Sequence, residues 1–387
     1  MGKSKVKKQK VQGQTSWRVR SSTVSAYVTR QAGHLAPVTF DRKKRKIQPF
    51  EVAPWATEKT PKGLPHLLTS LRGDFFCLPF GGNDTAYRKE QHPPHGQTAN
   101  DKWSLVGLDE KKDRHTLTLR MNTTVRQGVV DKQITLVDGH DALYCRHIVL
   151  NMSGKMSYGH HAIVKFPDEP GAGVYSHSPI KFGRTAPVPA EDPAAGGYSS
   201  LKVDQRFTSL SKVPLATGGF TDLTVYPARR GFEDIVTIVN RPTGPFAWNA
   251  VTFAKQRYVF FTLKDQAVLP QTVLWISNGG RHYTPWNGRH VNIMGIEDVC
   301  SYFHYGLEQS AKPNALSKAG SNTSVTLSAR RPLTVNYIMG VAKIPAGFDR
   351  VKSIKPAGVR KPGHIKLTAD SGKQVIAAVE HEFLQAE

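Results

Sequence analysis

The chain has 387 residues and a formal net charge of +23, with 53 Lys and Arg against 30 Asp and Glu. At 39% hydrophobic residues it can bury a large core, but no stretch reaches the roughly 18 apolar residues of a membrane span, and the polar N-terminus does not resemble a signal peptide. The three cysteines form no close pair, which favours a reducing compartment, so we expect a cytoplasmic protein.

The positive charge is concentrated near the N-terminus, where residues 1–60 hold 14 Lys and Arg against 3 Asp and Glu. We expect residues 1–20, which carry a run of lysines, to form a flexible basic arm ahead of a single domain over residues 21–387. Residues 42–46 form a second basic run between two strand-like segments, which indicates a hairpin tip. Basic runs bind phosphates, yet no recognition helix, zinc-ligand spacing or aromatic RNA-binding strand accompanies them, so we do not expect a nucleic-acid partner.

The first half of the chain alternates apolar or β-branched residues with polar ones, which is typical of strands with one buried face. Asp138-Gly139 lies between two of these segments and predicts a hairpin turn. A short helix is expected over residues 66–71. The expected strands of this half cover residues 24–33, 34–40, 102–108, 115–124, 128–139, 142–153 and 158–166.

Residues 167–200 are rich in Pro, Gly and Ala and are expected to form a long irregular loop, of the kind that often carries function. Strand-like segments resume after it, and a helix is expected over residues 297–308. The expected strands of this half cover residues 220–228, 233–240, 246–253, 258–263, 272–278, 324–329, 333–341 and 373–383. Together these segments predict an all-β, mainly antiparallel fold, a large β-sandwich with few short helices.

Residues 71–103 gather side chains suited to a polyhydroxylated ligand. Arg72 interrupts an apolar run, prolines and glycines then fix the turns, and His92, His95 and Trp103 follow. Arg and His donate hydrogen bonds to hydroxyls, and Trp offers a flat platform. The alternative is a solvated loop whose histidines bond to backbone groups.

Residues 272–298 form a second such segment, which ends on Glu297 after an apolar run. A carboxylate that ends an apolar strand is partly desolvated, which raises its pKa and makes it a better base. The alternative is a glutamate at the N-terminus of a helix, where it interacts with the amides of the first turn. The aromatic and basic members of the segment are Trp275, Arg281, His282, Trp286, Arg289 and His290.

His160, His161 and Asp222 are further candidates. The two histidines are neighbours in a strand-like segment, where successive side chains point to opposite faces, so only one can line a given cleft. They make unconvincing zinc ligands because no cysteine lies nearby, and we expect no metal site. Asp222 follows a glycine turn and either accepts hydrogen bonds from a sugar or caps that turn. The motifs of a serine-hydrolase elbow, a phosphate-binding loop and a dinucleotide-binding turn are absent from the sequence.

In their order and spacing these residues resemble the aldose 1-epimerases, or galactose mutarotase-like proteins, and within them most closely the hexose-6-phosphate epimerase branch. The resemblance spans about residues 24–345. It begins with an Arg-Gly pair, an apolar run to Pro-Phe-Gly, a His-Gly pair and a Trp, and continues through a later His, an Asp, a tryptophan strand and a closing Glu. The residues that carry it are Arg72-Gly73, Pro79-Phe80-Gly81, His95-Gly96, Trp103, His161, Asp222, Trp275 and Glu297.

The resemblance implies a β-sandwich of the galactose mutarotase-like (supersandwich) type and an isomerase that interconverts sugar anomers without a cofactor. Glu297 would be the base and His161 the acid, with His160 as the alternative. The family's arginine after His-Gly is Ala99 here, which implies an unphosphorylated sugar. The alternatives are a non-catalytic carbohydrate-binding protein, or a lyase or hydrolase using the same cleft; the oligomeric state stays open. The implied sugar-binding residues are Arg72, His95, Asp222, Trp286, Trp103 and Arg289.

Overall fold

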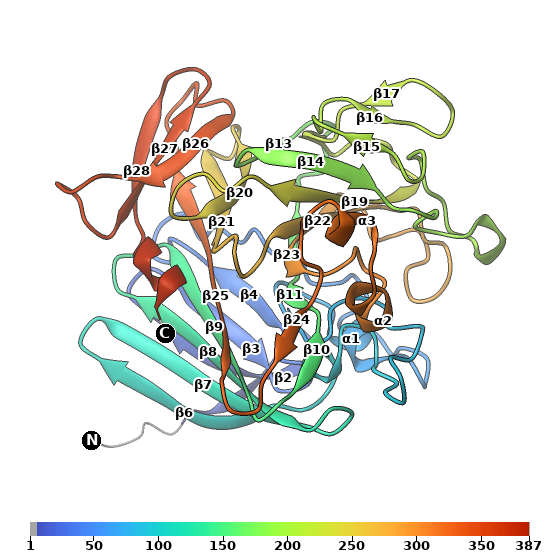
Figure 1. Cartoon of the computed structure of the whole chain (residues 1–387). Helices are drawn as coiled ribbons and strands as arrows, with labels where there is room; N and C mark the ends of the chain where they lie inside the picture. The colour runs from blue at the N-terminus through green and yellow to red at the C-terminus, as the bar shows by residue number, and fades with distance from the viewer. Residues whose placement is uncertain (1–5, 387) are drawn as a thin grey trace.

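The computed structural model describes residues 6–386, which fold around two large antiparallel sheets packed face to face (Figure 1). The first sheet has the strand order β18 (Val225–Tyr226), β13 (Gly173–His177), β20 (Ala247–Phe253), β21 (Tyr258–Lys264), β25 (Leu333–Lys343), β9 (Ala142–Leu150), β8 (Gly128–Val137), β7 (Arg114–Thr123) and β6 (Ser104–Lys111). The second has the order β15 (Arg206–Phe207), β14 (Ile180–Thr185), β19 (Phe232–Asn240), β22 (Gln271–Asn278), β23 (Ile293–Cys300), β11 (Tyr158–His160) and β5 (Phe76–Cys77), with β12 (Ala162–Lys165) also paired to β23. The all-β, mainly antiparallel sandwich expected from the sequence is confirmed.

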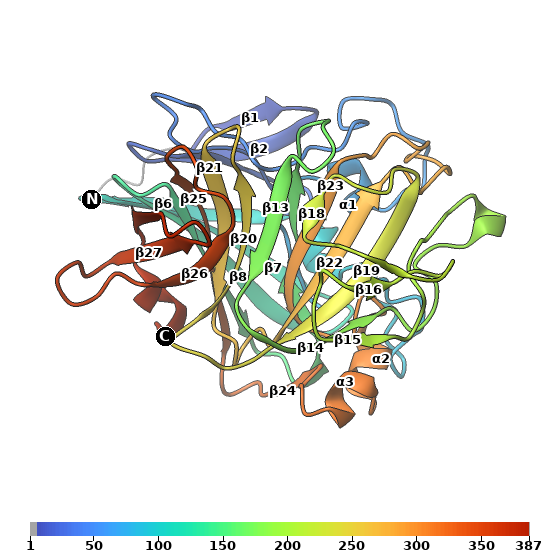
Figure 2. The same ribbon diagram turned by 90° about the horizontal axis from the view of Figure 1, so that it is seen from above.

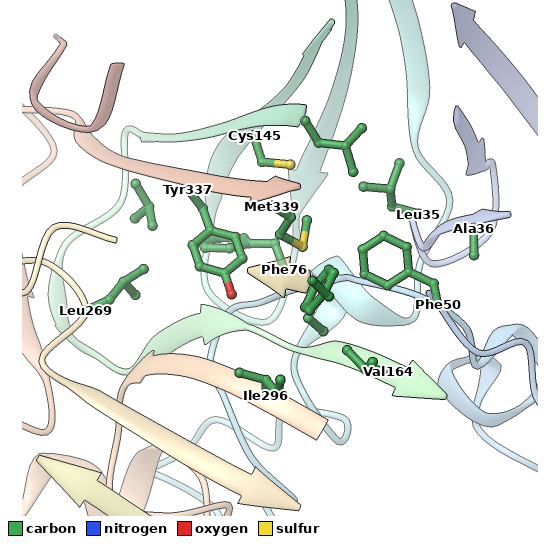
Figure 3. Packing of buried hydrophobic residues seen from close by; sticks show 14 of the residues in the cluster. Leu35, Ala36, Phe50, Phe76, Cys145, Val164, Leu269, Ile296, Tyr337 and Met339 are labelled. Carbon is green, nitrogen blue, oxygen red and sulfur yellow. The ribbon is translucent and has the colours of Figure 1, made fainter. Parts of the chain in front are cut away.

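The main core fills the space between these two sheets. Tyr337 and Met339 of β25 face Ile296 of β23 and Val164 of β12 across it (Figure 3). Every residue of β23 is buried, because a second hydrophobic cluster covers its other face. Glu297 lies on that second face, away from the main core, since neighbouring residues of a strand point to opposite sides.

The N-terminal segment differs from the flexible arm that its charge suggested. Residues 8–20 form two strands, in which Trp17 and Val19 are each 1% exposed while Arg18 and Arg20 point to solvent. This alternation is the pattern of a half-buried strand, and it makes residues 8–20 part of the folded body. Residues 1–5 lie outside the described residues. The four-stranded sheet so formed has the order β1 (Lys8–Val11), β2 (Gln14–Arg20), β3 (Ser25–Thr29) and β4 (Leu35–Thr39).

Smaller elements decorate the sandwich. A C-terminal sheet of β26 (Val351–Pro356), β27 (His364–Ala369) and β28 (Gln374–Ala378) lies outside the nine-stranded sheet and shares a hydrophobic cluster with it (Figure 2). The other pairs are β10 (Gly154–Met156) with β24 (Val325–Leu327) and β16 (Val213–Pro214) with β17 (Phe220–Thr221). The helices are α1 (His66–Ser70), α2 (Leu307–Ala311) and α3 (Ala315–Lys318), with short 3-10 turns at η1 (Gln97–Ala99), η2 (Pro193–Ala195) and η3 (His381–Gln385).

Two expected elements are wrong. The helix over residues 297–308 is absent, because Glu297 lies inside β23, which pairs on both sides, and helix begins only at Leu307. The loop over residues 167–200 contains β13 and β14. In contrast, α1 confirms the short helix, and the hairpin turns at residues 138–139 and 42–46 are present. Among residues 6–386, no helix is long and apolar enough to span a membrane.

Candidate active site

Glu297 and His161 are brought together by strand pairing. His161 lies between β11 and β12, and both of these strands pair with β23, through Gly159 with Val299 and Ala162 with Ile296. The pairing places His161 beside the side of β23 that carries Glu297. The distance from His161 Nε2 to Glu297 Oε1 is 3.1 Å, and both side chains are buried. An imidazole and a carboxyl at this distance can exchange a proton directly.

His160 points the opposite way, into the main core. Its Nδ1 lies 2.9 Å from Asp74 Oδ2, and its ring stacks on Tyr337 with 4.3 Å between the ring centroids. The histidine is fully buried. Of the two neighbouring histidines, therefore, only His161 reaches the carboxyl of Glu297.

A cavity opens beside the Glu297–His161 pair, with an empty volume of about 490 Å³ that includes its solvent-open mouth. The ring of His161 stacks on Phe75 at 4.5 Å and meets Trp275 edge-on at 5.6 Å, so its orientation is fixed. Largely aromatic walls with a few polar groups are typical of small-ligand sites. The lining residues are Leu67, Leu68, Leu71, Phe75, His95, His161, Ile235, Trp275, Arg281, Trp286, Glu297 and His304.

Burial favours the neutral forms of the titratable groups in this cavity. It raises the pKa of Glu297 well above its ordinary value, against the opposing attraction of Arg281, and it lowers the pKa of His161 well below its own. Burial, assisted by nearby positive charge, also lowers the pKa of His95 to about 3 and that of His304 to about 4. The Glu297–His161 pair therefore holds one proton near neutral pH, and the other two imidazoles are uncharged.

Arg281 supplies the cavity with a permanent cation. Its Nε donates to Glu191 Oε1 at 2.6 Å, and Glu233 Oε2 lies 4.0 Å from the same nitrogen. The guanidinium carbon lies 4.5 Å from the ring centroid of Trp286 and 5.3 Å from that of Trp275. The two terminal nitrogens make no hydrogen bond within residues 6–386, so they can donate to a ligand.

Arg72 does not line the cavity, and the role implied for it is wrong. It is fully buried, its Nε donates to the carbonyl of Ser70 at 3.1 Å, and its terminal nitrogens donate to the carbonyls of Val11 at 3.3 Å and Gln12 at 3.0 Å. Burial lowers the pKa of Arg72 to about 10. The guanidinium holds the β1–β2 turn against the sandwich, so it has a structural role.

Three other implied binding residues also lie elsewhere. Trp103 is buried and donates from Nε1 to the carbonyl of Thr98 at 3.0 Å. Asp222 is exposed and caps a turn, accepting from the backbone nitrogen of Thr224 at 2.7 Å. Arg289 forms two 2.7 Å hydrogen bonds with the exposed carboxylate of Glu58. Of the implied sugar-binding residues, only His95 and Trp286 line the cavity.

Four residues of the site were not assigned to it from the sequence. Arg281 and Trp275 belong to the aromatic and basic segment of residues 272–298, but the spacing within that segment does not show which side chains face the cavity. His304 follows β23 and carried no signal of its own. Glu191 lies in the proline-rich part of residues 167–200, where only the length of the segment suggested function.

Comparison with known proteins identifies the fold. No protein-family model and no curated protein sequence matches this chain. Solved structures match at low identity. A "putative aldose 1-epimerase" from Klebsiella pneumoniae has a TM-score of 0.59 and 12% identity, and the match covers 86% of this chain and 80% of that one. A galactose mutarotase-like protein from Clostridium acetobutylicum has a TM-score of 0.57 and 10% identity, and the match covers 88% of this chain and 98% of that one. A galactose mutarotase related enzyme from Lactobacillus acidophilus matches with a TM-score of 0.54 and 12% identity, covering 85% and 97%. The chain therefore has the galactose mutarotase-like fold.

Proposed function

We propose that this protein is an aldose 1-epimerase-like isomerase, which interconverts the anomers of an uncharged aldose. The observation that carries the proposal is the 3.1 Å contact between Glu297 and His161, at the wall of a cavity in a galactose mutarotase-like fold. The reaction needs one group that accepts a proton and one that donates it, and a carboxyl–imidazole pair provides both. We further propose a cytoplasmic location, which three buried free cysteines support.

The proposed reaction opens and recloses the sugar ring. The proton of the resting pair first passes from Glu297 to His161 across their 3.1 Å contact. The carboxylate of Glu297 then takes the proton of the anomeric hydroxyl, the bond from C1 to the ring oxygen breaks, and the imidazolium of His161 gives its proton to that ring oxygen. The open-chain aldehyde rotates about its C1–C2 bond and closes from the other face, with both proton transfers reversed. Because the two side chains are in contact, a proton can also pass between them and reset the pair. Each transfer contributes about 10²–10⁴-fold to the rate.

The charges around the cavity support an uncharged substrate. Ala99, which stands where the family's arginine would be, is buried and apolar. Burial raises the pKa of Glu233 to about 7, and the carboxylate of Glu191 already pairs with Arg281. The guanidinium charge is thus compensated by the protein, and a phosphate would find no unpaired cation there. Hydroxyls can still accept from the terminal nitrogens of Arg281.

A lyase or hydrolase is less well supported by the same cavity. Hydrolysis of a glycosidic bond uses two carboxyl groups placed across the bond. Among the described residues that line the cavity, Glu297 is the one carboxyl group, and none is a tyrosine.

The direct test follows anomer exchange in solution. Freshly dissolved α-glucose and α-galactose are mixed with the protein, and the approach to equilibrium is followed by polarimetry and by NMR of the anomeric protons. We expect at least one common aldose to equilibrate faster than in buffer alone. Binding of sugars without acceleration would replace the isomerase with a non-catalytic carbohydrate-binding protein.

The catalysed rate should show a broad maximum around neutral pH. Burial lowers the pKa of His161, so the pair gains a second proton, and loses activity, only at pH values below 6.5. Burial raises the pKa of Glu297, so the pair loses its single proton only well above pH 4.5. The measurement is kcat against pH, with the buffer rate subtracted at each point. A profile that rises through pH 4.5 to a plateau would mean that Glu297 behaves as an ordinary exposed carboxylate.

Replacing Gly295 by Ala should displace the base without removing it. A Cβ at this position would lie 2.6 Å from Glu297 Oε1 and 3.1 Å from the Cβ of Trp275, so the carboxyl must move. A shift of about 1 Å at a catalytic group lowers rates by up to about 10²-fold, and we expect a loss of about 10-fold to 10²-fold in kcat. The wild-type rate in a folded Gly295→Ala protein would contradict the assigned position of the carboxyl.

A further inference from the structure

A second concave surface lies where β26 of the C-terminal sheet meets β13 and β20 of the nine-stranded sheet (Figure 2). We call it the C-terminal groove. Its empty volume is about 1060 Å³, which includes open solvent, and it shares no lining residue with the cavity beside Glu297. The residues that line it are Pro179, Thr243, Gly244, Pro245, Phe246, Trp248, Lys352, Ser353, Ile354, Lys355 and Pro356.

One wall of the C-terminal groove is the free edge of a strand. Among residues 6–386, β26 is the end strand of its three-stranded sheet and pairs with β27 alone. The consecutive residues 352–356 all line the groove, although successive side chains of a strand point to opposite faces. A strand that lines a groove with both sets of side chains presents its backbone edge to that groove.

The backbone groups on this edge have no partner strand. The backbone nitrogen of Ala357 donates to the carbonyl of His364 at 2.9 Å, and in an antiparallel pair only every second residue bonds to the partner strand. This alternation directs the N–H and C=O of Ile354, and the C=O of Pro356, away from β27. Within the described part of the chain, none of these three groups bonds to another segment. They are therefore free to pair with an added strand.

The opposite wall of the groove is apolar and is held from behind. Phe246 and Trp248 contribute aromatic surface to it. The ring of Phe246 lies 5.5 Å from that of His381, and the carbonyl of Pro245 accepts from Gln385 Nε2 at 2.8 Å. Because these contacts fix the wall before a ligand arrives, little ordering is needed on binding, which favours affinity.

The groove carries positive charge without a counter-charge. Lys352 and Lys355 are exposed on its strand wall, and the exposed Arg241 adjoins it, since its backbone nitrogen donates to the carbonyl of Pro179 at 2.8 Å. Within residues 6–386 these three basic side chains form no ion pair or hydrogen bond, and no residue that lines the groove is acidic. An acidic strand is therefore attracted to this edge, whereas the same edge of a second copy would be repelled by its own lysines.

We infer that the C-terminal groove binds an extended acidic peptide of a partner protein, which adds as a strand to the free edge of β26. The backbone of the peptide pairs with the free backbone groups of β26, as in other complexes formed by strand addition. Because side chains alternate along a strand, acidic side chains can meet Lys352 and Lys355 while apolar ones lie against Phe246 and Trp248. The inference does not depend on the proposed isomerase, since the groove and the cavity share no lining residue.

The test measures the binding of synthetic peptides by fluorescence anisotropy at physiological ionic strength. The probe is a fluorescein-labelled octapeptide of alternating glutamate and valine, titrated with the whole protein. We expect it to bind at least about tenfold more tightly than the matched octapeptide of alternating lysine and valine. Equal affinities, or no binding of the glutamate–valine peptide, would overturn the proposal.

Methylated peptides separate strand addition from attraction of charge alone. In one version of the glutamate–valine peptide all valine backbone nitrogens carry a methyl group, and in the other all glutamate nitrogens do. The charge is unchanged, but each version loses the N–H donors of one edge. We expect one of the two to bind at least about tenfold more weakly than the unmethylated peptide. If both bind as tightly as that peptide, strand addition is wrong.

Two pairs of charge reversals locate the binding surface. Lys352→Glu with Lys355→Glu should weaken binding of the glutamate–valine peptide at least about tenfold. Arg360→Glu with Lys361→Glu changes the net charge equally in the exposed turn after β26, outside the groove, and should alter the affinity by less than about twofold. Thermal unfolding followed by circular dichroism verifies that both proteins are folded. Equal losses in the two proteins, or wild-type affinity in the first, would contradict the assigned surface.

Discussion

Glu297→Gln should lower the rate of catalysed anomer exchange by about 10²–10⁴-fold, with little change in the fold. The amide has the shape of the carboxyl and can still hydrogen-bond to His161, but it cannot take a proton from the sugar. Burial raises the pKa of Glu297, so the wild-type carboxyl is already neutral in the resting pair, and replacing it removes no buried charge. Exchange is measured by NMR at saturating sugar, and the free energy of unfolding by urea titration.

The neighbouring carboxylate of β23 provides the matched control. Asp298 faces the main core, where it accepts from Tyr337 at 2.8 Å and from Thr272 at 2.6 Å and pairs with the buried Lys264. Asp298→Asn leaves that ammonium without its counter-charge, which should cost about 3–5 kcal/mol of stability and leave exchange by the folded protein near the wild-type rate. A Glu297→Gln protein that exchanges anomers as fast as the wild type would eliminate Glu297 as the base.

The strands that could be predicted from the sequence are those with one buried face. In β7 and β8 apolar residues alternate with polar ones, and this period of two identifies a strand without further information. In β23 both faces are covered, so the run from Ile293 to Cys300 has no such alternation, and its extent was judged incorrectly. The strand β2 was missed for another reason: its alternating Trp17 and Val19 lie in a strongly basic segment, whose composition suggested an arm.

The Glu297–His161 pair could be singled out through the family resemblance, and the pairing of their strands brings the two side chains into contact. The binding residues could not be predicted. A buried arginine such as Arg72 can serve a ligand or satisfy backbone carbonyls, and here those carbonyls belong to residues 11 and 12, about sixty positions away in the chain. Arg281, in contrast, does line the cavity. Its orientation could not be predicted, because the hydrogen bond that fixes it goes to Glu191, which lies in a distant part of the sequence.

The alternation of side chains along a strand also explains why the sequence neighbours His160 and His161, and likewise Glu297 and Asp298, lie in different environments. His160 and Asp298 point into the main core, and His161 and Glu297 point to the cavity. Tyr337 connects the two residues that face the core, because its ring stacks on His160 and its hydroxyl donates a hydrogen bond to Asp298. These buried polar contacts therefore stabilise β11 and β23, the strands that position the proposed acid and base. Substitutions of His160 or Asp298 should mainly lower stability, whereas substitutions of His161 or Glu297 should mainly lower the rate of anomer exchange.

His161→Gln should lower the rate of catalysed anomer exchange by about 10²–10⁴-fold. Glutamine can keep a hydrogen bond to Glu297, but it cannot deliver a proton to the ring oxygen near neutral pH. Because the pair then retains only the carboxyl, the residual activity should follow the ionisation of Glu297 alone, as a single rise with pH. Both kcat and its pH profile are measured on the purified variant, together with its free energy of unfolding.

His160→Asn is the control that decides between the two histidines. An asparagine amide can still donate to Asp74 near the position of Nδ1, but it loses the ring that stacks on Tyr337 and meets Phe76. We expect stability to fall by about 1–3 kcal/mol, with kcat of the folded protein close to the wild type. The reverse pattern, with activity lost in His160→Asn and retained in His161→Gln, would transfer the acid to His160. That outcome would also remove the cavity as the reaction site, because His160 faces the core from which the cavity is separated by β23 and its partners.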